Sequence, residues 1–219
     1  MNSFFDPHQR ATVAAAMARI IPTTHTPGAA EAGTIDFLDG YLAGIGRIYA
    51  KPDGSGFETL SGRRAQAWQQ RIDILRTTYV TGVADLDRLS RDTHGRPFID
   101  LETDQQDAVL AALERPGEEA AMNASQATMG FAPVEPALQQ ASVEISLSFL
   151  ALLALHTRQG FYADPIYGGN RGQVGWQTIG FPGPSSLAEV HSGRYTVIEY
   201  FAEGTHEQEM EISNARTQA

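Results

Sequence analysis

Asp164 and His156 are the residues of this chain whose types could carry acid–base chemistry. A carboxylate and an imidazole can serve as general acid and general base, as in a carbohydrate-active enzyme. Asp164, however, precedes Pro165, where an aspartate commonly accepts hydrogen bonds from the backbone of a turn. His156 lies in strongly apolar sequence, which favours a hydrogen-bonded core histidine over a proton carrier. We therefore interpret both as structural residues, with a stand-alone carbohydrate-active enzyme as the alternative.

The other potential ligands form no metal or haem motif. His206-Glu207 lacks the second histidine that a zinc-peptidase helix requires. The chain has no cysteine, which excludes disulfides, thiolate zinc sites, cysteine-ligated iron–sulfur clusters and covalent c-type haem. We predict no catalytic residue, no bound cofactor and no metal for this chain. The six histidines are scattered along it: His8, His25, His94, His156, His191 and His206.

Residues 160–184 combine seven glycines, three prolines and five aromatic residues in 25 positions. The glycines from 168 to 175 imitate a phosphate-binding loop, but a helical pattern precedes them and Trp176 follows, so the strand–loop–helix context of a nucleotide site is missing. Glycine and proline predict a long irregular loop, whose aromatic surface must be covered either by the body of the protein or by a partner. Both possibilities remain open from the sequence.

The same segment resembles the gluconate 2-dehydrogenase subunit 3 family. The resemblance extends over about residues 8–184. It is carried by residues 160–165, 167–171, 175–176 and 180–183, with further similarity at 20–22, 27–29, 31–33, 98, 101, 105–106 and 110.

This resemblance implies a small subunit that accompanies a large flavin-containing dehydrogenase of the glucose-methanol-choline type. The partner would hold FAD and oxidise a hydroxyl of a sugar, glycoside or sugar acid, while this chain binds and stabilises it without a cofactor of its own. A cytochrome subunit is a further partner that the resemblance leaves open. A transient folding or export escort for the flavoprotein is the alternative role.

We expect the loop to dock the partner. The residues predicted for docking are its aromatic side chains, the polar residues between them and the glycines and proline that shape it: Phe161, Tyr162, Asp164, Tyr167, Gly168, Gly169, Asn170, Arg171, Trp176, Phe181 and Pro182.

Composition limits the other partners. The chain carries 26 acidic and 16 basic residues, a net charge of −10, which opposes binding to nucleic acid and to anionic lipid. Its longest apolar run, residues 149–155, is far shorter than the ~20 residues of a membrane span. No signal peptide precedes the first apolar stretch, so we expect a cytoplasmic chain; export with the partner, or a removed signal, would make it periplasmic.

Apolar periodicity predicts one all-α domain of about five helices over residues 1–184, followed by a partly irregular extension over 185–219. Thr103 and Gln106 predict a capping box for the fourth helix. Residues 118–133 are expected to be a crossing loop, only 195–201 has strand character, and 203–219 is a polar tail. The expected helices span residues 7–21, 34–49, 63–91, 103–113 and 135–159.

Overall fold

The computed structural model describes residues 3–114, 144–181, 183–184 and 188–189. Within these ranges the chain is helical and contains no β-strand beyond an isolated bridge between Ala50 and Phe57, which confirms the all-α prediction. The α-helices are α1 (Pro7–Ile20), α2 (Ala29–Ala32), α3 (Thr34–Leu42), α4 (Gly62–His94), α5 (Thr103–Ala112), α8 (Phe149–Tyr162) and α9 (Val174–Thr178). The 3-10 helices are η1 (Ile45–Arg47), η2 (Phe98–Asp100), η3 (Pro165–Tyr167) and η4 (Arg171–Gln173).

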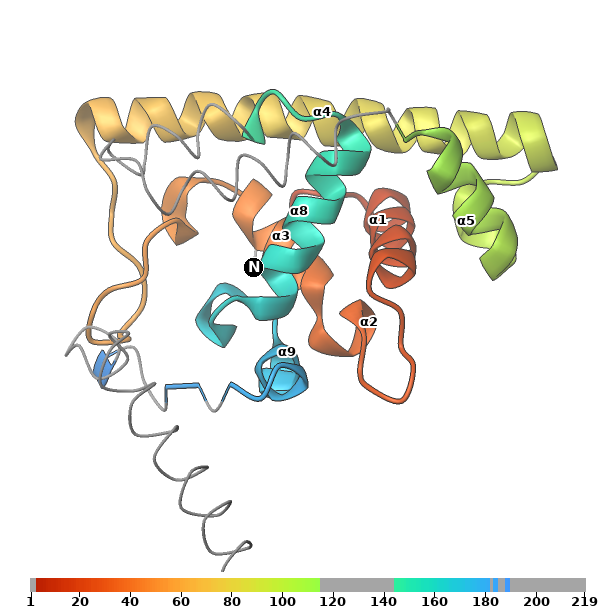
Figure 1. Cartoon of the computed structure of the whole chain (residues 1–219). Helices are drawn as coiled ribbons and strands as arrows, with labels where there is room; N and C mark the ends of the chain where they lie inside the picture. The colour runs from red at the N-terminus through yellow and green to blue at the C-terminus, as the bar shows by residue number, and fades with distance from the viewer. Residues whose placement is uncertain (1–2, 115–143, 182, 185–187, 190–219) are drawn as a thin grey trace, which may run out of the picture.

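The long helix α4 lies along one side of the molecule, and α1, α3 and α8 pack beneath it (Figure 1). Helix α5 lies at the carboxyl-terminal end of α4, while α9 lies at the end of α8 that points away from α4 (Figure 1). The largest side chains between these helices are fully buried: Met17, Leu38, Leu42, Tyr79, Phe98, Leu152, Leu153 and Phe161.

Helices α1 and α4 agree with the sequence-based prediction. The Asp6 carboxylate accepts a hydrogen bond from the Gln9 backbone N–H at 2.8 Å, and Pro7 occupies the first helical position. Helix α4 ends before Gly95, whose φ of 71° is the left-handed conformation that glycine adopts readily at a helix end.

Helix α3 is shorter than predicted. The periodic pattern continues to Tyr49, but the helix ends at Leu42. The Arg76 guanidinium, from α4, donates hydrogen bonds to the Leu42 carbonyl at 2.7 Å and the Ala43 carbonyl at 2.9 Å. These bonds satisfy carbonyls that a further helical turn would have used. Gly44 follows with φ 149°, a backbone conformation that glycine adopts more readily than other residues.

Two further boundaries differ from the prediction. Residues 145–148 are not helical, because the Ser148 side chain caps α8 at its N-terminus by accepting from the Ala151 N–H. The α5 capping box lies one residue earlier than expected, with Gln105 accepting from the Glu102 N–H at 3.1 Å. The predictions for residues 118–133, 135–143, 195–201 and 203–219 lie outside the described residues, as does nearly all of the predicted extension.

Candidate functional site

The segment 160–184, which we call the signature loop, is folded into short helices rather than being irregular as predicted. Its first residues complete α8, and η3, η4 and α9 follow. Asp164 starts η3 by accepting a hydrogen bond from the Ile166 N–H at 2.9 Å. This contact confirms the interpretation of Asp164 as a turn residue.

Asn170 holds the two halves of the signature loop together. Its side chain is wholly buried, donating through Nδ2 to the Ala163 carbonyl at 2.9 Å and accepting at Oδ1 from the Gly175 N–H at 2.8 Å. Its φ of 48° places it in the left-handed region that asparagine tolerates better than most residues. The asparagine therefore supplies both the turn and the cross-link.

Glycines let the signature loop lie directly on the backbone of α8. A Cβ on Gly169 would overlap the carbonyl of Gly160, and one on Gly175 would overlap the carbonyl of Phe161. No other residue fits at these two positions without a backbone shift. The glycine content predicted irregular chain, whereas here it permits close packing.

Two predicted docking aromatics are internal. Phe161 is 1% exposed and Trp176 is 6% exposed. The Trp176 indole Nε1–H donates to the Tyr162 carbonyl at 2.8 Å, and its ring packs edge-on against Phe181 with centroids 5.4 Å apart. Within this chain Phe161 and Trp176 act as the core of the signature loop.

The remaining predicted docking residues lie nearer the surface. Tyr162 is 41% exposed, whereas the Tyr167 hydroxyl accepts from the Ala50 N–H at 3.1 Å and its ring meets Phe57. Arg171 is exposed, Gly168 is half-buried with φ 103°, and Pro182 lies outside the described residues.

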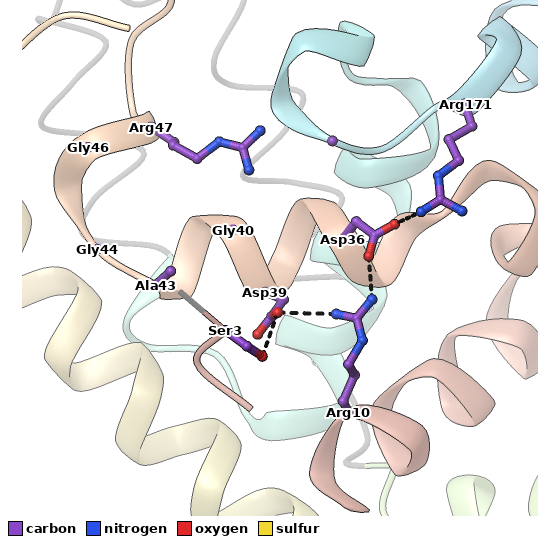
Figure 2. A pocket seen from close by; sticks show the side chains of 11 residues that line it. Ser3, Arg10, Asp36, Asp39, Gly40, Ala43, Gly44, Gly46, Arg47 and Arg171 are labelled. Carbon is purple, nitrogen blue, oxygen red and sulfur yellow. Dashed lines mark hydrogen bonds and ion pairs between the residues drawn. The ribbon is translucent and has the colours of Figure 1, made fainter. Parts of the chain in front are cut away.

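A pocket of about 650 Å³ opens where the signature loop meets α1, α3 and η1. Figure 2 shows Arg10 of α1 and Arg171 of the loop meeting at Asp36 of α3, with both ion pairs drawn. Asp39, one turn further along α3, accepts from the backbone N–H groups of Phe4 and Phe5 at 2.9 and 3.0 Å. The lining residues are Ser3, Arg10, Asp36, Asp39, Gly40, Ala43, Gly44, Gly46, Arg47, Gly168 and Arg171.

Sequence reasoning missed this pocket, apart from Gly168 and Arg171. Its walls come from four separate stretches of chain, at residue 3, residue 10, residues 36–47 and residues 168–171, and no motif joins them. The one available signal was the pair of aspartates on α3, three positions apart and therefore on one helix face.

His156 belongs to a buried polar network. Its Nδ1 lies 2.8 Å from the Tyr79 hydroxyl and its Nε2 lies 2.5 Å from Glu144 Oε1, with no exposed surface on the imidazole. Arg71 forms an ion pair with the same carboxylate, and the Tyr41 hydroxyl donates to it. This arrangement confirms the interpretation of His156 as a hydrogen-bonded core histidine.

Burial sets the protonation of this network. Desolvation, with a smaller effect of the Arg71 guanidinium, lowers the pKa of His156 to about 3. Burial likewise raises the pKa of Tyr41 to about 12 and that of Tyr79 well above its usual value. The neutral imidazole then donates from Nε2 to Glu144 and accepts at Nδ1 from Tyr79. The charge of Glu144 is balanced by Arg71.

Two kinds of site are missing from the described part of the chain. No group of three or more histidine, aspartate and glutamate side chains is arranged there to hold a metal ion. No helix in the same residues is long and apolar enough to cross a membrane.

Comparison with known proteins gives one match. Residues 7–183 match the model of the family described as gluconate 2-dehydrogenase subunit 3. No curated protein and no solved structure matches the chain significantly.

Proposed function

Because the chain belongs to the gluconate 2-dehydrogenase subunit 3 family, we propose that it is the non-catalytic small subunit of an FAD-dependent dehydrogenase, which it binds and stabilises. Family membership makes it a subunit of a dehydrogenase complex. The finer part of the proposal is that the partner is a glucose-methanol-choline-type flavoprotein that oxidises a hydroxyl of a sugar, glycoside or sugar acid by hydride transfer to FAD.

The architecture of the signature loop supports a docking role for its exposed side chains. Internal packing buries the side chains of Phe161, Asn170 and Trp176, so these residues stabilise the conformation of the loop. Tyr162 and Ile179, exposed at 41% and 59%, offer apolar surface to a partner. A rigid frame that presents such side chains loses little conformational entropy on binding.

The alternative of a stand-alone enzyme is not favoured by the positions of its two candidate residues. His156 has no exposed surface, so a carbohydrate in a surface cleft cannot reach its imidazole. Asp164 accepts the Ile166 N–H and serves as a turn cap. We therefore assign neither residue a catalytic role.

Coexpression tests the proposal. The chain, purified alone and with the glucose-methanol-choline flavoprotein encoded in the same genome, would be assayed for flavin absorbance, subunit ratio and oxidation of sugars with an artificial electron acceptor. We expect a complex of fixed stoichiometry, active only when the flavoprotein is present. Activity of the chain alone, or failure of the two chains to associate, would contradict the proposal.

The escort alternative predicts a different outcome of the same experiment. An escort would leave after assembly, so flavoprotein purified away from this chain would keep full activity and thermal stability. A stabilising subunit should instead raise the melting temperature of the flavoprotein. The cytochrome subunit, the cytoplasmic location and its periplasmic alternative remain predictions.

A further inference from the structure

Ile179, at the end of α9, is the most exposed large hydrophobic side chain among the described residues, at 59%. Its apolar neighbours in the sequence turn inward: Trp176 is buried, and Val174 and Phe181 are half-buried. The Phe181 ring packs edge-on against the Trp176 indole. Packing within the chain therefore covers the aromatic neighbours and leaves most of the isoleucine in solvent.

Backbone hydrogen bonds fix the turn that presents Ile179. The N–H groups of Ile179 and Phe181 donate to the Trp176 carbonyl at 3.2 and 2.9 Å. The Gly180 N–H donates to the Gln177 carbonyl at 3.1 Å, and Gly180 has φ 69°, the left-handed conformation that glycine commonly takes after a helix. Because the turn is formed before binding, a partner that contacts Ile179 need not order this backbone, and the entropic cost of binding is small.

The backbone that leads into α9 is strained. Asn170 and Gln173 are the non-glycine residues with positive φ in the described part of the chain, at 48° and 59°. Asparagine tolerates this conformation, whereas glutamine adopts it rarely. Helix α9 begins at the residue after Gln173. Strained backbone persists where the surrounding structure enforces it, and such positions cluster at functional sites, so the strain favours a functional role for the placement of α9.

The exposed surface of the signature loop carries little charge. Asp164 and Arg171 are the charged residues of positions 160–184. Asp164 is half-buried and caps η3, and Arg171 forms an ion pair with Asp36. The other exposed residues in the described part of the loop are Tyr162, Gly172, Gln177, Thr178, Ile179 and Gly180. Charged residues are depleted at the centre of protein–protein interfaces, so this surface has the composition of an interface core.

From these observations we propose that Ile179 inserts into an apolar, uncharged recess of the dehydrogenase subunit and anchors the complex. The inference rests on the proposed function and adds the anchoring residue and the chemistry that the partner must present. A second copy of the chain is a poorer occupant, because two chains of net charge −10 repel each other. The dehydrogenase subunit is the partner to which family membership points.

The test uses the full chain and the purified flavoprotein subunit, with the dissociation constant measured by calorimetry at low and at high salt. We expect Ile179→Ala to weaken binding by about tenfold or more, because the truncated side chain no longer fills the recess. Ile179→Asp should weaken it further, since it places an unpaired carboxylate in apolar surroundings, whereas Ile179→Leu should lose less affinity than Ile179→Ala. The effect of Ile179→Ala should be the same at both salt concentrations, because no charge changes.

Ile99→Ala is the control for a general effect of truncating an exposed isoleucine. Ile99 is 36% exposed in η2, which lies between α4 and α5 in the sequence, and both of these helices lie away from α9 (Figure 1). Its affinity for the flavoprotein should equal that of the wild-type chain. Circular dichroism and the melting temperature confirm the fold of every variant.

The outcomes separate this inference from the proposed function. If the wild-type chain binds the flavoprotein and the folded Ile179→Ala and Ile179→Asp variants bind within about twofold of it, Ile179 is not the anchor, although the subunit role stands. If the wild-type chain does not bind, the proposed function fails first, and this inference fails with it. A loss for Ile179→Ala that disappears at high salt, or an equal loss for Ile99→Ala, would also overturn the inference. Sedimentation of the chain alone tests the second copy: a dimer that Ile179→Asp dissociates would assign Ile179 to self-association and overturn the proposal.

Discussion

The indole Nε1–H of Trp176 donates a hydrogen bond to the backbone carbonyl of Tyr162, 2.8 Å away, and so ties α9 to the last residue of α8. The indole also lies beneath Gly183, where a Cβ would overlap the ring. Trp176 is therefore enclosed by the loop that it belongs to. An aromatic residue that sequence reasoning assigned to a partner interface is, in the isolated chain, a packing residue.

Replacement of Trp176 by alanine should lower the free energy of unfolding by about 3–5 kcal/mol, because the change leaves a cavity and removes the hydrogen bond to Tyr162. Chemical denaturation followed by circular dichroism measures this loss. Trp176→Phe should cost less, since it keeps most of the apolar volume. If Trp176→Ala is as stable as the wild-type chain, the internal packing role of Trp176 is wrong. The docking role predicted from the sequence would then be the better explanation.

Gly169→Ala should destabilise the chain by about 1–3 kcal/mol or more, because the added methyl group overlaps the Gly160 carbonyl. Gly46→Ala is the matched control: its Cβ meets nothing within 4 Å, so a change within about 0.5 kcal/mol is expected. Melting temperatures of the two variants, measured side by side, check the difference. Equal effects would show that the loop does not rest on α8 as described.

The helices that were predicted correctly from the sequence are those determined by residues within the helix itself. In α4, residues such as Ile72, Leu75 and Tyr79 repeat at helical spacing and are buried, so the prediction of 63–91 lies close to the observed Gly62–His94. The end of α3 was not predictable in this way. It depends on Arg76, which is distant in sequence and reaches the helix end only in the folded protein.

The same distinction explains the site. The residue types of the signature loop indicated that the segment has a distinct structural or docking role. They did not indicate which of its side chains are buried. Asn170 and Gly169 acquire their roles from contacts with residues that precede them, at Ala163 and Gly160. The pocket depends on the ion pair between Arg10 of α1 and Asp36 of α3. The charges of the two residues do not by themselves predict that they form this pair.

His156 should make stability depend on pH. Its pKa is about 3 in the folded chain and about 6.5 when unfolded, so the unfolded state binds more protons between these values. The stabilisation is complete above about pH 6.5 and is lost as the pH falls toward 3. Between pH 7 and pH 5 the contribution of this one group should decrease by about 2 kcal/mol, as calculated from about 1.36 kcal/mol per pH unit.

A comparison with His156→Gln isolates this effect from other titrating groups. The variant should be less stable than wild type at pH 7, because Glu144 and Tyr79 lose a well-placed partner, and the difference should narrow toward pH 5. Nitrogen chemical shifts of the imidazole should show a neutral ring across this range. A ring that becomes protonated near pH 6 in the folded protein would contradict the assignment.

Tyr162 provides the direct test of docking through the signature loop. Its side chain is 41% exposed, so Tyr162→Ala should change the free energy of unfolding by less than about 1 kcal/mol. If the ring anchors the interface, the same substitution should weaken binding to the flavoprotein by about tenfold or more, as measured by calorimetry at fixed salt. Ile74→Ala is the control, because Ile74 is 44% exposed and belongs to α4, a helix that lies on the side of the molecule away from α9 (Figure 1). Because Tyr162 is uncharged, its effect should be insensitive to salt. If a folded Tyr162→Ala chain binds the flavoprotein with unchanged affinity, this face of the loop is not part of the interface. If Tyr162→Ala and Ile74→Ala weaken binding equally, the loss of affinity is not specific to the signature loop.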